Sequence, residues 1–355
     1  MPETVTATAT LTCPAPLAQR DRIVLGHGSG GRLSAELLRD VFLPLFANPV
    51  LDRMDDQAIV EVGGARLAFT TDSFVVQPLF FPGGDIGSLA VHGTVNDLAM
   101  GGARPLFLSA GFILEEGFST ELLRRIAESM ANAAAAAGVA IVTGDTKVVE
   151  RGKGDGVFIN TTGIGIVPDG VRLSASQARP GDRVILSGAI GDHGIAILAQ
   201  REGLEFETEI QSDSAALHGL VARMLASAPA GAVRCMRDPT RGGVSSALNE
   251  IAAQSGVSIQ IDETSIPVRD EVRGACELLG LDPLYVANEG KLLAIVAPEA
   301  ADEILQAMRS DRLGVEARII GTVGDETAGL VTMKTAFGST RIVDMLAGEQ
   351  LPRIC

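Results

Sequence analysis

Short apolar runs alternate with amphipathic stretches along most of this 355-residue chain. Apolar positions at helical spacing predict a helix over Leu33–Phe46, which Pro44 should bend or end. Two strands are predicted at Ala58–Val62 and Arg66–Thr70, and the Gly63-Gly64 pair between them is typical of a hairpin turn. The pattern therefore begins by mixing helices with locally paired strands.

Two further helices carry start and stop signals. Asp85 is the predicted N-cap of a helix that ends at Met100, before two glycines, and Ser119 is the predicted N-cap of a helix over Thr120–Ala137. The remaining predicted strands are Ile23–Leu25, Ala140–Thr143, Val157–Val167, Val184–Ser187, Val257–Ile261, Tyr285–Val286, Leu292–Val296 and Val315–Val323. The remaining predicted helices are Gly194–Gln200, Ser214–Ala226 and Gly243–Ala253.

This succession of hairpins and helices predicts an α+β protein with two domains, which also suits its length. The turn-rich segment 178–182 and the new β run after it place the domain boundary near residues 169–179. We expect a flexible N-terminal extension over 1–21, an N-terminal domain over 22–168, a C-terminal domain over 169–336, and a mobile tail over 337–355 that ends in Cys355.

Composition narrows the class of protein. Hydrophobic residues make up 46% and charged residues 21%, which is typical of a globular chain, and no apolar run is long enough to span a membrane. The first residues contain no basic region that would indicate a signal peptide. The net charge of −15 disfavours nucleic acid as a partner, because phosphates would be repelled. Four scattered cysteines without a C-x-x-C pair predict reduced thiols and a cytoplasmic protein.

A glycine-rich segment, residues 26–31, follows the first predicted strand. It contains Gly28, Gly30 and Gly31 and formally satisfies the dinucleotide-binding pattern G-x-G-x-x-G. That fold needs a parallel second strand, whereas the next strand here returns as a hairpin, which disfavours it. A loop that cradles phosphates with backbone N–H groups, or a plain flexible loop, remains open.

Acidic residues recur at the ends of apolar runs. Asp56, Asp72, Asp97 and Asp145 follow this pattern, and each alone is more typical of a cap or turn. Together they could hold hard cations between the protein and phosphates. No Walker A motif occurs, so ATP binding would require a different fold.

Further candidates have equally ordinary alternatives. Lys147, with Thr146 after Asp145, could contact a phosphate or form a surface ion pair. The turn that contains Asp238 could bind an anion or simply cap a helix, and the turn at Glu289 could be a hairpin. Cys355, the last residue, is a candidate nucleophile but does not form a prenylation motif.

The order of these motifs resembles that of the ATP-dependent superfamily of aminoimidazole ribonucleotide synthetase, selenophosphate synthetase and thiamine-phosphate kinase. Within that superfamily the chain resembles the HypE family of hydrogenase maturation factors from about Arg22 to its end. The motifs that carry the resemblance are Asp55-Asp56, Thr70-Thr71-Asp72, Asn96-Asp97, Gly144-Asp145-Thr146-Lys147, Pro180-Gly181-Asp182, His27–Gly31, Arg237–Gly243, Asn288-Glu289-Gly290 and Pro352-Arg353-Ile354-Cys355.

The resemblance implies a fold and a reaction. The fold is a two-domain α+β, aminoimidazole ribonucleotide synthetase-like fold whose N-terminal domains form a dimeric β-barrel, with ATP near the domain and dimer interfaces. The carbamoyltransferase HypF loads a carbamoyl group onto the terminal thiol. The enzyme then dehydrates this group to a thiocyanate with ATP and Mg²⁺, and the cyanide passes to iron on a HypC–HypD scaffold for a [NiFe]-hydrogenase.

The resemblance also implies roles for residues. Asp56, Asp72, Asp97 and Asp238 would bind Mg²⁺ and phosphates, and Cys355 would carry the substrate. Lys147 would neutralise charge on the transferred phosphoryl group, and Glu289 would accept a proton. The remaining predicted nucleotide-binding residues are Gly28, Gly30, Gly31, Asp145 and Thr146.

Two alternatives remain open. Selenophosphate synthetases use a Cys or selenocysteine with a Lys in the glycine-rich segment, and residues 26–31 contain neither. A non-catalytic, ATP-regulated scaffold for metallocentre assembly, or another ligase of the superfamily, would fit the other motifs.

Overall fold

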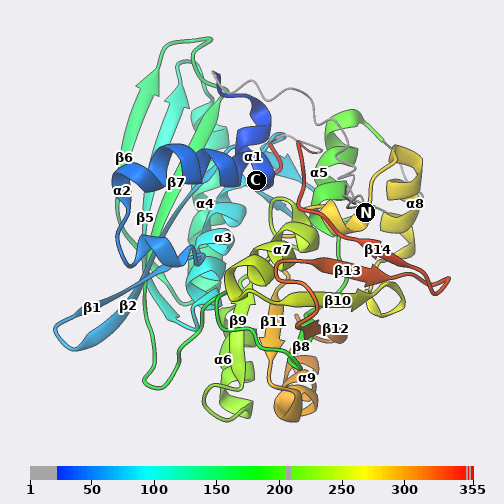
Figure 1. Cartoon of the computed structure of the whole chain (residues 1–355). Coiled ribbons are helices and arrows are strands. Elements are labelled where there is room, and N and C mark those ends of the chain that lie inside the picture. Colours follow the sequence, from blue (N-terminus) through cyan, green and yellow to red (C-terminus); the bar gives the residue numbers. More distant parts are fainter. Residues whose placement is uncertain (1–21, 205–208, 349–350, 352) are drawn as a thin grey trace, which may run out of the picture.

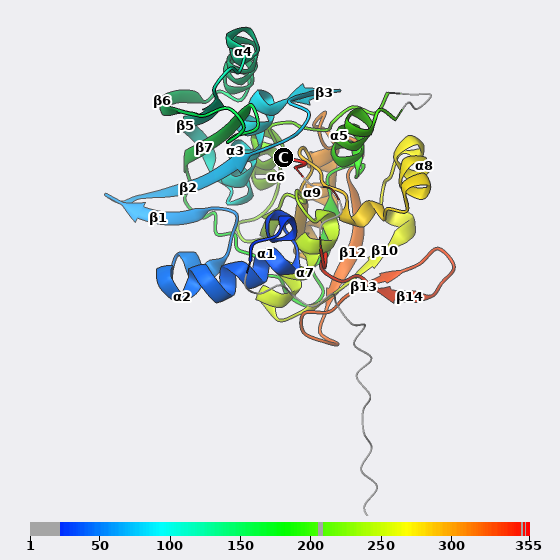
Figure 2. The same ribbon diagram turned by 90° about the horizontal axis from the view of Figure 1, so that it is seen from above.

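A computed structural model describes residues 22–204, 209–348, 351 and 353–355, so the predicted N-terminal extension lies outside the described residues. Two mixed sheets, each covered by helices, lie next to each other (Figures 1 and 2). The predicted two-domain α+β architecture is therefore confirmed.

The N-terminal sheet has the strand order β1-β2-β7-β5-β6. Neighbouring strands are antiparallel except β5 and β6, which are parallel and are connected along the chain by helix α4. Its strands are β1 (Ala58–Val62), β2 (Ala65–Phe74), β5 (Arg104–Glu115), β6 (Ala140–Val149) and β7 (Val157–Ile166), and the helices packed on it are α3 (Ile86–Met100) and α4 (Thr120–Ala136).

The local signals explain these elements. Gly63 and Gly64 both have positive φ, 58° and 83°, as the predicted hairpin turn between β1 and β2 requires. The Asp85 carboxylate accepts hydrogen bonds from the first-turn N–H groups of α3, which confirms it as the N-cap. Almost every residue of α3 is buried, because this helix contacts both the N-terminal sheet and elements of the C-terminal half, α6 and β9.

The C-terminal sheet has the order β14-β13-β10-β12-β8-β11-β9. Alternation along its strands gives it two buried faces. Leu186 packs with residues of α7, whereas its neighbour Ile185 packs with residues of α6 and α9. The strands are β8 (Arg183–Leu186), β9 (Val233–Arg237), β10 (Ser258–Asp262), β11 (Leu293–Val296), β12 (Arg318–Gly324), β13 (Val331–Lys334) and β14 (Thr340–Ile342). The helices are α5 (Asp192–Glu202), α6 (His218–Ser227), α7 (Gly243–Ser255), α8 (Asp270–Leu279) and α9 (Ala301–Arg309).

Two of the predicted strands are wrong. The 3-10 helix η1 (Leu25–Gly28) replaces the strand expected at Ile23–Leu25, and η5 (Pro283–Tyr285) replaces the one at Tyr285–Val286. Asp282 caps η5 by accepting from the N–H of Leu284 at 3.0 Å. Two or three apolar residues do not specify a strand unless a neighbouring strand pairs with them.

The predicted first helix is confirmed but divided. It consists of α1 (Arg32–Leu37), a π-helical turn (Leu38–Phe42) and α2 (Leu43–Phe46). Pro44 has no N–H to donate, and its ring would clash with the carbonyl four residues earlier in a regular α-helix. The wider π turn just before it relieves this conflict.

The end of the chain returns to the space between the two sheets, where Figure 1 marks the C-terminus. Strand β14 pairs with β13, so the sheet continues past residue 336, where the predicted tail begins. Residues 353–355 then run antiparallel to residues 75–77. The N–H of Val75 donates to a main-chain carboxylate oxygen of Cys355 (2.9 Å), and the N–H of Gln77 donates to the carbonyl of Arg353 (3.2 Å).

The N-terminal sheet stays open in the single chain, with β1 and β6 as its edges among the described residues. One face packs on α3 and α4, whereas exposed apolar side chains lie on the other face and along β6. They are Phe69, Phe107, Ile113, Ile141, Val142, Val148 and Ile164. Among the described helices, none has the length and hydropathy needed to cross a bilayer.

Candidate active site

A polar cavity of about 250 Å³ lies where the two halves of the chain meet. Its acidic side chains come from separate elements: the segment before β1, strand β2, helix α3, the turn after β9, helix α7 and the loop before β11. The residues that concern its chemistry are Asp56, Asp72, Asp97, Asp238, Glu289 and Cys355. The structure thus brings together the four carboxyls predicted to bind metal and two of the three predicted catalytic residues.

Crowding and burial perturb these carboxyl groups. Burial, together with the nearby Asp56, raises the pKa of Asp238 to about 8. Burial raises the pKa of Asp56 to about 6, and it raises the pKa of Asp97 well above its usual range, with Asp238 and Asp72 adding to the shift. The pKa of Asp72 is also raised by burial. Four acids that resist ionisation next to one another favour a bound cation.

Basic residues from the end of β9 and from the turn after it face this acidic cluster. Arg237 lies 3.4 Å from the Asp56 carboxylate and 2.5 Å from that of Glu250 on α7. Arg241 donates to the carbonyl of Gly28 at 2.9 Å, which connects this turn to the glycine-rich segment. Glu250 was not among the predicted site residues. Its only signal in the sequence is an acid next to the apolar residues of a helix.

The glycine-rich segment packs closely against the C-terminal half. Gly30 lines the acidic cavity, and Gly28 lines a smaller adjoining cavity of about 60 Å³. At Gly30, with φ of +72°, a Cβ atom would lie 2.6 Å from Arg241. At Gly31 it would lie 2.2 Å from the carbonyl oxygen of Leu346. These two glycines are therefore required by backbone approach, whether or not the loop also binds phosphates.

Asp145, Thr146 and Lys147 do not reach the cavity of their own chain. They lie on β6, where Lys147 and Asp145 form an exposed ion pair of 2.6 Å. Strand pairing places Asp145 three strands from Ser73, the neighbour of Asp72. With strands about 4.8 Å apart, this separation is about 14 Å. A single subunit therefore does not bring these three residues together with the acidic cluster, because β5 and β7 lie between them.

Cys355 is held at the junction of the two cavities, and it lines both. Burial raises the pKa of its thiol, Arg241 opposes that shift, and Glu289 adds to it. The preceding residue, Ile354, is only 4% exposed and packs in the same apolar cluster as Phe74. The thiol is therefore brought to the acidic cavity by contacts of the backbone and of Ile354.

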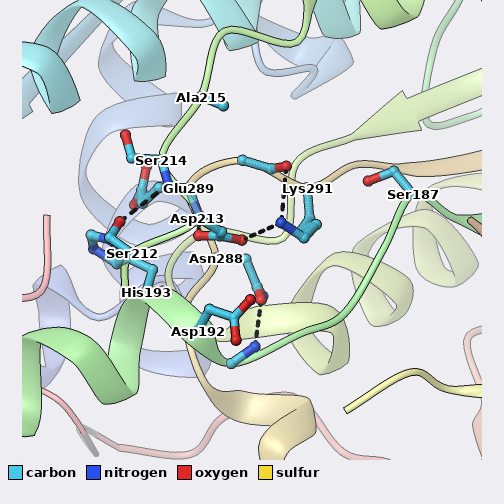
Figure 3. A network of polar contacts seen from close by, with 12 residues as sticks. Ser187, Asp192, His193, Ser212, Asp213, Ser214, Ala215, Asn288, Glu289 and Lys291 are labelled. Atoms are coloured by element: carbon cyan, nitrogen blue, oxygen red, sulfur yellow. Dashed lines mark hydrogen bonds and ion pairs between the residues drawn. The ribbon is translucent and has the colours of Figure 1, made fainter. Parts of the chain in front are cut away.

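Glu289 is buried, with one carboxylate oxygen that has no hydrogen-bond partner among the described residues. Burial raises its pKa well above the usual range, and Asp238 and Asp72 add to this shift. Its backbone N–H donates to Asp213 at 3.0 Å, and Asp213 pairs with Lys291 at 3.0 Å (Figure 3). The main chain at Glu289 is thus fixed, while one oxygen of its carboxyl group is left without a hydrogen-bond partner among the described residues.

Comparison with known proteins agrees with this geometry. The models of the AIR synthase related protein family match the chain over residues 54–167 (N-terminal domain) and 179–334 (C-terminal domain). The carbamoyl dehydratase HypE of Azotobacter vinelandii is 63% identical over 329 residues, which are 93% of this chain and 96% of that protein.

Solved structures show the same similarity. A crystal structure of a HypE–HypF complex matches with a TM-score of 0.83 and 50% identity, over 87% of this chain and 99% of the other. HypE in complex with ATP matches with a TM-score of 0.79 and 51% identity, over 94% of this chain and 100% of the other. The chain therefore belongs to the HypE family of AIR synthase related proteins.

Proposed function

We propose that this chain is an ATP-dependent carbamoyl dehydratase that converts an S-carboxamide on Cys355 into a thiocyanate. The observation that carries the proposal is the position of Cys355, which lines the same cavity as Glu289 and the four aspartates. A relative with 63% identity is named carbamoyl dehydratase, and a structure with 51% identity is a complex with ATP.

The aspartates suit a nucleotide that arrives with a divalent cation. Asp56, Asp72, Asp97 and Asp238 would hold Mg²⁺ through carboxylate oxygens, and the ion would offset charge on the phosphates. Among the described residues, no group of three or more His, Cys, Asp or Glu side chains is arranged to hold a metal ion unaided. The phosphate oxygens of ATP would therefore complete the coordination, and the glycine-rich segment would lie beside them.

The reaction then needs little covalent chemistry from the protein. The carboxamide oxygen attacks the γ-phosphorus of ATP and ADP leaves, which turns a poor leaving group into a phosphate ester. The nitrogen loses both of its protons, the carbon–oxygen bond breaks, and inorganic phosphate departs as the C≡N bond forms. One S-carboxamide and one ATP thus give one thiocyanate, one ADP, one phosphate and one proton.

Glu289 is the group best placed to accept one of these protons. Because the pKa of Glu289 is raised, its carboxylate is a stronger base than an ordinary one. Glu289 lines the same cavity as Cys355, and one of its carboxyl oxygens has no hydrogen-bond partner among the described residues. Arg241, which lines both cavities with Cys355, would stabilise negative charge on the transferred group.

We also propose that the enzyme is a homodimer built through the N-terminal sheets. The uncovered face of that sheet and strand β6 expose apolar side chains, and Val142 on β6 is 59% exposed. A second copy would cover them and pair with the free edge, which would close a barrel from two open sheets. Lys147 on β6 would then lie at the interface and serve the cavity of the second copy.

The proposed partners follow from the reaction. A carbamoyltransferase, HypF, would load Cys355, and a HypC–HypD scaffold would accept the cyanide for the iron of a [NiFe]-hydrogenase. A matched structure is itself a HypE–HypF complex. A domain limit near residue 168 and a mobile C-terminal tail remain part of this proposal, but the tail would begin after β14 and not at residue 337.

Intact-protein mass spectrometry tests the function. The wild type and Cys355→Ala are incubated with the carbamoyltransferase, carbamoyl phosphate and ATP. We expect a carbamoyl adduct that loses one water, only when Cys355 and hydrolysable ATP are both present. A loaded Cys355 that never loses water would instead indicate the non-catalytic scaffold.

A further inference from the structure

We propose that His193 is a positioning residue that holds the C-terminal residues 353–355 in their docked position. It does so as one neutral tautomer, which a hydrogen bond with Ser212 fixes. Its kinetic consequence rests on the proposed function, but its effect on the tail does not. His193 lies in the first turn of α5 and is completely buried. Its ring packs edge-on against Phe81, with 5.7 Å between ring centroids.

The imidazole connects two segments that are far apart in the sequence. Nε2 lies 2.8 Å from the carbonyl oxygen of Ile354, and Nδ1 lies 2.8 Å from the hydroxyl of Ser212. Farther along α5, Arg201 donates to the carbonyl of Arg353 at 2.8 Å. Helix α5 therefore holds two successive carbonyls of the tail, immediately before Cys355.

The neighbours of the ring determine where its proton lies. The N–H of Ser214 donates to the Ser212 hydroxyl oxygen at 3.1 Å, so the Ser212 hydroxyl hydrogen is available to His193. Nδ1 then accepts from Ser212, and Nε2–H donates to Ile354. Burial lowers the pKa of His193, which agrees with the neutral form. Because a carbonyl can only accept, this tautomer is the neutral one that satisfies both contacts.

The same segment holds the proposed base. Asp213, next to Ser212, accepts from the N–H of Glu289, as Figure 3 shows. On the other side, Asn288 accepts from the N–H of Gly191 at 2.8 Å, just before α5 begins. The same two segments, the start of α5 and residues 212–213, therefore position both the docked tail and the backbone of Glu289. A change at His193 should move Cys355 relative to Glu289 and leave the acidic cluster in place.

The test measures how well the tail protects Cys355 from alkylation. The full-length wild type, His193→Phe and His193→Gln are treated with iodoacetamide, and modified Cys355 is followed by peptide mass spectrometry. Phe keeps the ring but removes the donor, so we expect alkylation about tenfold faster, the value of one buried hydrogen bond. Gln restores an N–H donor and should return the rate close to that of the wild type. His218→Phe, on α6, is the control and should leave it unchanged.

A kinetic experiment tests whether the docked position of the tail matters for the reaction. In a single turnover of carbamoylated protein, His193→Phe should slow dehydration about tenfold with unchanged affinity for ATP. Ser212→Ala removes the hydrogen bond that fixes the tautomer of His193 but no contact of the tail itself, so it should accelerate alkylation severalfold. This variant replaces His193→Phe in the test if His193→Phe does not fold.

Equal alkylation rates in the wild type, His193→Phe and Ser212→Ala would overturn the inference, as would a His193→Gln variant that behaves like His193→Phe. If the wild type makes no thiocyanate while the alkylation rates differ as expected, the proposed function fails and the role of His193 in seating the tail stands.

Discussion

Replacing Asp238 by Asn should make the free protein more stable and the enzyme inactive. Asp238 is 9% exposed and shares its cavity with three other aspartates. Near neutral pH the unfolded chain carries this carboxyl ionised, whereas the folded protein must bind a proton there because the folded pKa is about 8. The amide has a similar shape and needs no proton, so the variant avoids this cost.

The magnitude follows from the shift. The pKa of Asp238 rises from 3.8 to about 8, and each pKa unit corresponds to about 1.4 kcal/mol. At pH 7 the cost of proton uptake is therefore at most about 4 kcal/mol, and we expect a gain of about 2 kcal/mol after local rearrangement. For a chain of 355 residues, with an unfolding entropy of about 2.1 cal/mol/K per residue, that gain raises the Tm by about 3 °C. The sign depends on pH: the gain is absent below about pH 4 and grows as pH rises towards 8.

Thermal unfolding of nucleotide-free protein between pH 4.5 and 8 would measure this effect. Asp145→Asn is the matched control, because Asp145 is exposed and the ion pair with Lys147 lowers its pKa. That control should not gain stability at any pH, whereas Asp238→Asn should gain Tm as pH rises and lose Mg²⁺-dependent ATP turnover. A Tm difference that does not change with pH would refute the idea that the free cavity resists ionisation.

Three further predictions concern the tail and the second copy. Cys355→Ala should abolish thiocyanate formation while calorimetry shows unchanged ATP binding; lost binding would argue against a carrier role. Val142→Asp should weaken subunit association about a hundredfold or more by burying an unpaired charge, as light scattering would detect, and an unchanged dimer would place the interface elsewhere. Mixing Lys147→Ala with Cys355→Ala, each inactive alone, should restore about a quarter of wild-type activity if Lys147 acts across the interface. No recovery in proven mixed dimers would refute that arrangement.

Local signals predicted much of the N-terminal half. The Gly63-Gly64 hairpin and the Asp85 cap are encoded within a few residues, so pattern alone was sufficient. Strand β5 was missed, although it lies between β6 and β7 in the sheet. It begins at Arg104-Pro105 and follows α3 closely, and its extended form depends on two partners that are remote in the sequence.

The site shows a similar division. Motifs indicated Asp56, Asp97 and Cys355, because each belongs to a distinctive run of residues, and the fold brings them to one cavity. The position of Lys147 could not be predicted, since it depends on which strands separate it from the aspartates. His193 carried no signal either, because its role comes from a tail that is distant in sequence.

The burial of Ile354 has a consequence for delivery of the product. Exposing a fully buried isoleucine to water costs about 1.5–3 kcal/mol, which favours the docked tail over the released one about ten- to a hundredfold. A thiocyanate on Cys355 therefore spends most of its time shielded from hydrolysis. An acceptor protein competes best with this docked position if it has an apolar pocket for the tail. Ile354 then moves from one hydrophobic pocket to another as the cyanide is transferred.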